Sequence, residues 1–182
     1  MRAEWEVMTS TLQTYVQTMD TVSEITGKIA AWMFFFTGVI VSFEVFMRYA
    51  LNSPTIWVDE ISRILQVWAA YLAIAYVLKH KAHIIIDITF RDPNSFGRKV
   101  CDTFAMLVII FFCLITVKYG IDIWWKSTVS GHTTDSYLAV PKVYIQSAIW
   151  VGFGLMALQS AAEIIKIWTW DPSVSPKQTL VH

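Results

Sequence analysis

Long apolar runs, separated by short polar connections, dominate this chain. Four of these runs are as long as the roughly 20 mostly apolar residues that an α-helix needs to cross the hydrocarbon core of a bilayer. They cover residues 27–49, 58–78, 100–123 and 143–168. The pattern therefore predicts an all-α integral membrane protein, whose membrane domain (residues 27–168) contains four transmembrane helices.

The first 26 residues follow a different pattern. Apolar residues recur there in alternating steps of three and four, which places them on one face of a helix. These residues are Trp5, Met8, Leu12, Tyr15, Met19 and Val22. The polar face is acidic, whereas helices on a lipid surface are usually basic. Residues 1–26 are therefore predicted to form an amphipathic helix packed on this chain or on a partner, with a place in the membrane interface as the alternative. Residues 169–182 are expected to be a flexible tail.

Composition agrees with a membrane environment. Of the 182 residues, 55% are hydrophobic and 15% are charged, so the chain is more apolar than soluble domains usually are. The formal net charge is zero, which gives no electrostatic argument for nucleic acid. Membrane lipids are therefore expected partners, and nucleic acid is not.

The distribution of basic residues predicts the orientation. The second connection carries five of them: Lys79, Lys81, Arg91, Arg98 and Lys99. Because short basic loops stay on the cytoplasmic side, this connection and, with four crossings, both termini should be cytoplasmic (N-in/C-in). Lys126 and Lys142 in the third connection weigh slightly against this, but Asp122 and Asp135 partly offset them. Residues 84–88 are apolar and too short to cross, which suggests an interfacial or re-entrant segment.

The residue types that often form catalytic or metal sites are not arranged here as such sites require. The histidines lie at predicted membrane edges or in the tail: His80, His83, His132 and His182. Cys101 and Cys113 share one hydrophobic run without the CxxC spacing of a redox or metal site. No Ser/His/Asp set or Walker loop occurs. We therefore expect no enzymatic activity, no cofactor and no metal site.

Polar residues are densest where the first two crossings meet. The cluster comprises Glu44, Arg48, Asn52, Trp57, Asp59, Glu60 and Arg63. Glu44 and Arg48 are four residues apart, Asp59 and Arg63 are also four apart, and Glu60 and Arg63 are three apart. Each spacing puts the two groups on one helix face. Because ionisable groups near hydrocarbon are costly, we interpret the cluster as a structural or interface clamp; the alternative is contact with ions or substrate.

Independent transport is a weaker hypothesis. Secondary transporters place their sites on helices interrupted by Gly or Pro, usually in duplicated halves, and this chain has neither a clear repeat nor a proline inside a crossing. A stand-alone small multidrug-type transporter using Glu44 remains an alternative. A membrane anchor of an unrelated complex is another.

The segment FMRYALNSPTIWVDEISRILQVWAAYLAIAYVLKHKAHIIID resembles the small membrane subunit, of DctQ type, of tripartite ATP-independent periplasmic (TRAP) transporters. Around the first turn the resemblance is carried by Phe46, Arg48, Tyr49, Asn52, Pro54, Trp57, Asp59, Glu60 and Arg63. Further on it is carried by Lys79, Lys81, His83, Asp87 and Pro141. It covers residues 27–165 in the family's order; Lys79 and Ala82 depart from the Arg and Gly of many relatives.

This resemblance implies a scaffold in a bacterial or archaeal cytoplasmic membrane. In the family, a periplasmic substrate-binding protein (P type) delivers an organic acid to a complex of the small subunit with a large permease subunit (M type). The large subunit carries the substrate and sodium sites and moves in an elevator-like way. The implied role is therefore support of sodium-driven uptake without ATP, with Trp32, Phe35 and Trp68 as exposed contacts to lipid or partner. Dicarboxylates, sugar acids and sulfonates all remain open as substrates.

Overall fold

A computed structural model describes residues 2–81, 96–134, 136 and 138–169 of the chain. These residues form four α-helices: α1 (Arg2–Ala50), α2 (Trp57–Lys81), α3 (Phe96–Val129) and α4 (Val143–Thr169). All four are long and apolar enough to cross a membrane. The predicted all-α class and the four membrane-spanning helices are therefore confirmed.

The amphipathic segment and the first crossing form one helix, whereas the sequence suggested a boundary between residues 26 and 27. With a rise of 1.5 Å per residue, the 49 residues of α1 extend over about 73 Å, more than twice the roughly 30 Å of the hydrocarbon core. Gly27, at the expected boundary, allows a close approach of α2: a Cβ atom there would lie 2.4 Å from Cδ2 of Tyr76. The change from an amphipathic to an apolar pattern near Gly27 therefore marks a change in what surrounds α1. The helix itself continues through this point.

The buried side of α1 follows a seven-residue repeat. Its most buried residues are spaced by seven along the helix: Val16, Ser23, Ala30, Thr37 and Glu44. Half-buried residues lie between them at the same interval: Leu12, Met19, Thr26, Met33, Ile40 and Met47. This is the a/d pattern of a left-handed coiled coil, so α1 packs along its neighbours through one continuous seam.

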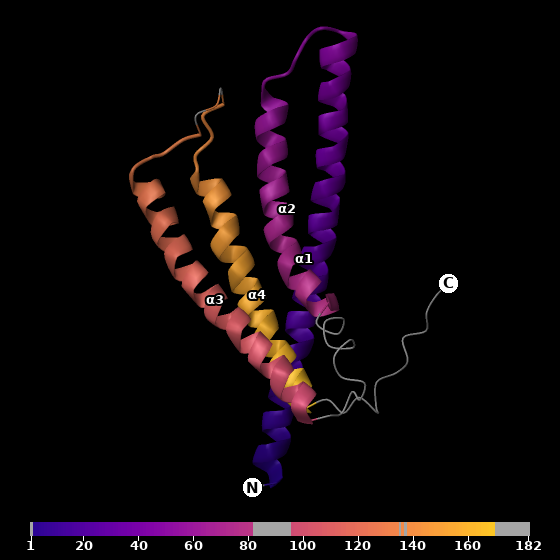
Figure 1. Cartoon of the computed structure of the whole chain (residues 1–182), viewed down its shortest axis with the longest axis vertical. Coiled ribbons are helices and arrows are strands. Elements are labelled where there is room, and N and C mark those ends of the chain that lie inside the picture. Colours follow the sequence, from indigo (N-terminus) through magenta and orange to yellow (C-terminus); the bar gives the residue numbers. More distant parts are fainter. Residues whose placement is uncertain (1, 82–95, 135, 137, 170–182) are drawn as a thin grey trace, which may run out of the picture.

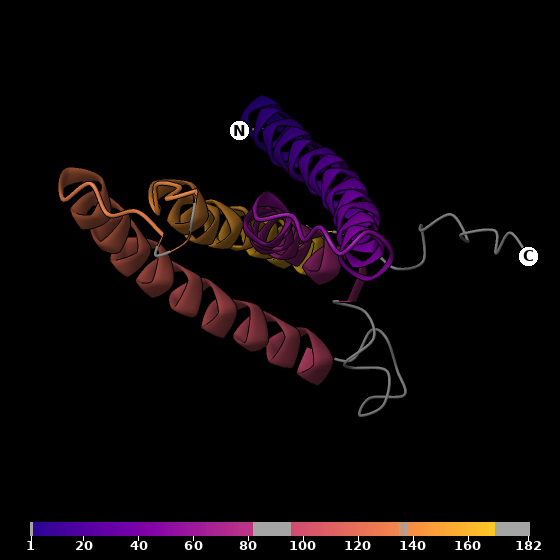
Figure 2. The same ribbon diagram turned by 90° about the horizontal axis from the view of Figure 1, so that it is seen from above.

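The helices pair as two antiparallel hairpins, α1–α2 and α3–α4, with α4 in the middle of the arrangement (Figure 1). Helix α4 packs against α3, α2 and α1, whereas within the described residues α3 contacts α4 alone. Seen from above, α1 and α3 lie on opposite sides of α2 and α4 (Figure 2). The N-terminal end of α1 and the C-terminal end of α4 lie at the same end of the molecule, and the hairpins diverge toward the α1–α2 turn (Figure 1).

Small residues bring α2 and α4 close together. A Cβ atom on Gly152 would lie 2.7 Å from the carbonyl oxygen of Tyr71. Ala69 on α2 and Ala148 on α4 are fully buried. Small side chains let helix backbones approach closely, which is how membrane helices gain packing energy without a hydrophobic driving force.

Candidate functional site

Two polar clusters lie at opposite ends of the helix hairpins. The turn cluster comprises the predicted residues around the α1–α2 turn together with Thr55. The buried network, at the other end, comprises Asp20, Ser23, Gln159, Glu163 and Lys166. The predicted clamp residues thus all lie in the turn cluster, and the buried network is a second cluster.

Asn52 shapes the turn after α1. It adopts a left-handed conformation with φ 49°, which Asn tolerates better than most residues. This conformation lets the backbone N–H of Ser53 donate to the carbonyl oxygen of Met47 at 3.1 Å. The chain therefore reverses within a few residues and returns to α1.

Glu44 holds this turn against α1. Its Oε1 accepts hydrogen bonds from Arg48 Nη2 at 2.8 Å and from Arg48 Nε at 3.2 Å. Its Oε2 accepts from the backbone N–H of Thr55 at 3.0 Å and also from the Thr55 hydroxyl. Although Glu44 is buried, both carboxylate oxygens have partners, so it acts as a fixed link between helix and turn.

Glu60 has partners that the spacing did not predict. Its Oε1 accepts hydrogen bonds from the hydroxyls of Thr134 and Ser136, both at 2.5 Å. The expected pairing of Glu60 with Arg63 is not formed, because Glu60 is buried toward the α3–α4 connection. Arg63 instead pairs with Asp59 at 2.8 Å, and this pair lies on the surface. Glu60 therefore joins the two hairpins at the end where they diverge.

The α3–α4 connection is folded so that it can reach Glu60. Gly131, with φ 61°, ends α3 in a Schellman-type cap, in which the His132 N–H donates to the Ser127 carbonyl at 3.1 Å. The connection then pairs with itself: the Thr134 N–H donates to the Val140 carbonyl at 2.9 Å. These bonds place the hydroxyl groups of the connection beside the first turn of α2.

The predicted aromatic contacts divide into two kinds. Trp32 and Phe35 are 61% and 59% exposed, and with Phe36 they form an aromatic group on the outer face of α1. Trp68 was expected on the outside but is half-buried, because its indole N–H donates to the carbonyl of Tyr144 on α4 at 2.9 Å. Trp57 lies at the start of α2 and is 41% exposed.

The predicted second connection is described only at its two ends, residues 79–81 and 96–99. Lys79 Nζ donates to Glu24 Oε1 at 2.8 Å and to the Asp20 carbonyl at 3.2 Å, so it ties the end of α2 to α1. His83, Asp87 and the side chain of Lys81 lie outside the described residues. His80, which the sequence placed at a membrane edge, lies 2.9 Å from the same Glu24 oxygen.

The buried network joins α1 to α4. Lys166 Nζ donates to Asp20 Oδ1 at 2.6 Å and to Glu163 Oε1 at 2.7 Å. Gln159 Nε2 donates to the same two carboxylates at 3.1 and 2.9 Å, and Gln159 Oε1 accepts from the Ser23 hydroxyl at 2.6 Å. Gln159 and Glu163 are only 1% and 3% exposed. One cation, two carboxylates and an amide thus satisfy one another inside the chain.

Sequence reasoning missed this network. In the sequence, Gln159 and Glu163 are isolated polar residues inside the predicted fourth crossing, and Asp20 lies on the polar face of the predicted amphipathic helix. The signal that was available is their position: Ser23 lies on the seven-residue seam of α1, and Gln159, Glu163 and Lys166 follow one another at helical spacing on α4. Membrane-embedded polar residues at helical spacing indicate a facing partner.

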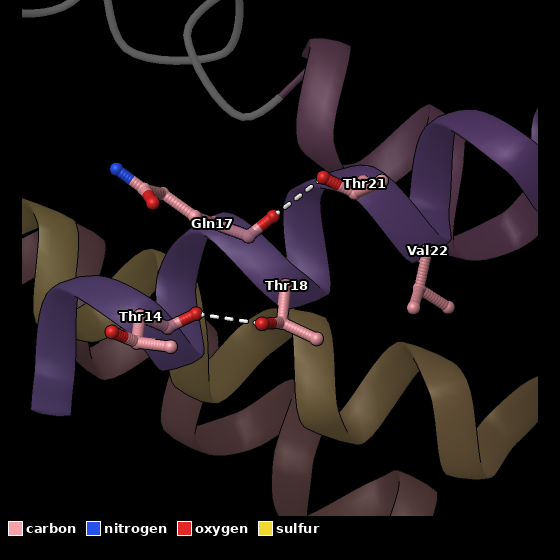
Figure 3. A pocket seen from close by; sticks show the side chains of 5 residues that line it. All are labelled: Thr14, Gln17, Thr18, Thr21 and Val22. Carbon is pink, nitrogen blue, oxygen red and sulfur yellow. Dashed lines mark hydrogen bonds between the residues drawn. The ribbon is translucent and has the colours of Figure 1, made fainter.

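A shallow hollow of about 280 Å³ lies on the N-terminal part of α1 and is lined by Thr14, Gln17, Thr18, Thr21 and Val22 (Figure 3). Two of its hydroxyls turn back to their own helix: Thr18 donates to the Thr14 carbonyl and Thr21 to the Gln17 carbonyl, both at 2.8 Å. In the described part of the chain, no group of three or more His, Cys, Asp or Glu residues is arranged to hold a metal ion.

Comparison with known proteins adds an independent finding. The family model of the DctQ component of tripartite ATP-independent periplasmic transporters matches residues 37–169. The sialic acid TRAP transporter permease protein SiaT of Haemophilus influenzae is 27% identical over 84 residues, which are 46% of this chain and 14% of that protein. The isethionate TRAP transporter permease protein DctMQ of Oleidesulfovibrio alaskensis is 26% identical over 133 residues, or 66% of this chain and 20% of that protein.

A shorter relative is similar as well. A putative TRAP transporter small permease protein of Haemophilus influenzae is 22% identical over 80 residues, which are 44% of this chain and 50% of that protein. The chain thus spans half or less of the length of each of these relatives.

Proposed function

The chain belongs to the DctQ component family of tripartite ATP-independent periplasmic transporters, and on this premise we propose that it is the small membrane subunit of such a transporter. In this role it packs against a large permease subunit and fixes the static part of the complex. It thereby supports sodium-driven uptake of an organic acid that a periplasmic binding protein delivers. The chain itself carries out no catalysis.

The observation that carries this proposal is the surface of α3. Only 11% of its apolar stretch is buried inside the chain, and large apolar residues cover the rest, such as Phe104, Phe111 and Leu114, each at least 60% exposed. In two relatives the similar region is a small part of a much longer permease chain. Both facts support a subunit that presents apolar helices to lipid and to a larger membrane protein.

The ion pairs favour a fixed scaffold over a stand-alone exporter. A transporter that used Glu44 would need this carboxylate to be open to its substrate, yet Arg48 and Thr55 occupy both of its oxygens. The basic residues of the second connection support an orientation in which both termini are cytoplasmic. In that orientation the α1–α2 turn and the α3–α4 connection face the periplasm, where Glu44 and Glu60 hold them as a surface for the binding protein.

The decisive experiment is purification of this chain in mild detergent from its native membrane, with mass spectrometry of whatever remains bound. We expect a large multi-spanning permease at about a one-to-one ratio. Recovery of this chain alone, as a homo-oligomer, would refute the scaffold role and make Glu44 the first residue to test for transport.

Arg63 tests the contribution of the turn cluster. Because the Arg63–Asp59 pair is exposed, Arg63→Ala should change the free energy of unfolding of the subunit by less than about 1 kcal/mol. We expect it to reduce co-purified permease or uptake, while substrate capture by the binding protein is unchanged. Arg63→Lys, which keeps the charge, is the matched control. Normal complex formation and normal uptake with Arg63→Ala would exclude a clamp role for this residue.

A further inference from the structure

A lysine on the outer face of α3 has no partner among the residues that the structure describes. Lys118 is exposed, and it makes no hydrogen bond or ion pair within the part of the chain that the structure describes. Its neighbours on the same helix face are apolar and exposed: Phe111, Leu114, Ile121 and Trp125. Lys118, with Asp122 one turn away on the same helix, is therefore a charge in a mostly apolar surface.

Contacts between helices show how deep this lysine lies. Gly120 packs against Trp150 of α4, where a Cβ atom would be 3.5 Å from Trp150 Cβ. Two residues further along α4, Gly152 packs against Tyr71 of α2. Because α3 and α4 are antiparallel, Lys118 is level with Gly152 and hence with Tyr71.

Tyr71 is the middle of the uncharged stretch of α2. It lies eight residues after Arg63 and eight before Lys79, or about 12 Å along the helix from each charged end. A lysine side chain is shorter than this distance, so extending along the helix does not bring its ammonium group to either end. Lys118 thus lies within the membrane-spanning part of the helix bundle, where an ionisable group is costly and by default marks a functional contact.

The one nearby carboxylate on the same helix does not neutralise it. Asp122 is four residues from Lys118, a spacing that permits an ion pair, but within the described residues no ion pair joins the two. Helix α3 also contacts no helix other than α4 in the described part of the chain. Within the described residues Lys118 therefore has no partner, and its exposed side chain is open to a second protein.

We infer that Lys118 forms an ion pair with a carboxylate on a transmembrane helix of the large permease subunit. This inference rests on the proposed function and specifies which helix face serves as the interface. A cation that becomes buried when an apolar surface is covered selects a complementary anion, and the apolar residues around it exclude water from the pair. The ion pair of Lys118 thereby fixes the depth and orientation at which the permease helix packs on the apolar face of α3.

The test uses the assembled complex and three variants. Lys118→Leu suits a lipid-facing helix and should leave the subunit folded, but it leaves the opposing carboxylate unpaired; we expect about tenfold less permease to co-purify. Lys118→Arg should retain the permease. Lys126→Leu is the matched control, because Lys126 is also exposed but lies two turns nearer the end of α3, and it should have no effect.

A direct measurement identifies the partner group. Dicyclohexylcarbodiimide, which enters the hydrocarbon core, activates carboxylates for amide formation with an adjacent amine. We expect mass spectrometry to find a cross-link between Lys118 and an acidic residue of the permease in the wild-type complex.

Three results would overturn the inference. The first is recovery of the permease with Lys118→Leu at the wild-type level together with no cross-link, as expected if the lysine contacts lipid phosphate. The second is a loss with Asp122→Asn as large as that with Lys118→Leu, which would show an intrahelical pair. In the third, wild-type chain brings down no permease, and the proposed function fails as well.

Discussion

Helices α3 and α4 form one hairpin but have opposite roles in the fold. The apolar stretch of α3 has a mean hydropathy of 2.5 and is 11% buried, whereas that of α4 has a mean hydropathy of 1.5 and is 33% buried. The less apolar helix is therefore the central one. In a bilayer the solvent is apolar, so the most apolar helix belongs on the outside, and polar side chains turn inward to meet one another.

The largest loss of stability is expected when the cation of the buried network is removed, because this network holds the central helix α4. Lys166→Leu would leave the carboxylates of Asp20 and Glu163 facing each other without a counter-charge. Removing one partner from a buried ion pair costs about 3–5 kcal/mol, so we expect a loss of stability of this size. Thermal unfolding of the purified subunit in detergent measures it, and Lys166→Arg is the control. A variant as stable as wild type would show that α4 is not held by this network.

A smaller loss of stability is expected from a change at the contact between α4 and α2. In Gly152→Ala the new methyl group would lie 2.7 Å from the Tyr71 carbonyl oxygen, so the two helices must separate, at a cost of about 1–3 kcal/mol. Gly154 is two residues away on the same helix with no atom within 4 Å of a Cβ there. Gly154→Ala should therefore be neutral or slightly stabilising. Equal unfolding midpoints for the two variants would contradict the close packing of α2 and α4.

The smallest effect on stability is expected on α3. Phe111 and Leu114 are 66% and 60% exposed, so replacing either by Ala should change the free energy of unfolding of the isolated subunit by less than about 0.5 kcal/mol. The same variants should recover less permease if this face is the interface. A large loss of stability in the isolated subunit would mean that α3 is held by contacts within the chain.

The sequence predicted the features that depend on local spacing. The four spans follow from apolar runs bounded by charge, and the Glu44–Arg48 and Asp59–Arg63 pairs follow from a separation of four residues on a helix. Contacts between distant segments were not predictable in this way. Asp20 and Lys166 are 146 positions apart, and Glu60 meets Thr134 only because the α3–α4 connection folds back toward α2.

The start of the chain shows a different limit of sequence patterns. Amphipathicity reports what surrounds a helix, and its change near residue 26 suggested a boundary between two elements. Helix continuity instead depends on backbone geometry, which nothing in residues 2–50 interrupts. The seven-residue repeat of buried residues from Val16 to Glu44 runs through residues 26 and 27 without a break.

The length of α1 has a mechanical consequence. No proline interrupts it between Arg2 and Ala50, and sharp bends in helices usually occur at proline. The segment outside the hydrocarbon and the segment within it therefore tilt as one rod, pivoting on the seam that α2 and α4 grip. A displacement of the N-terminal end of this rod is therefore transmitted along α1 to the part that packs on α2 and α4.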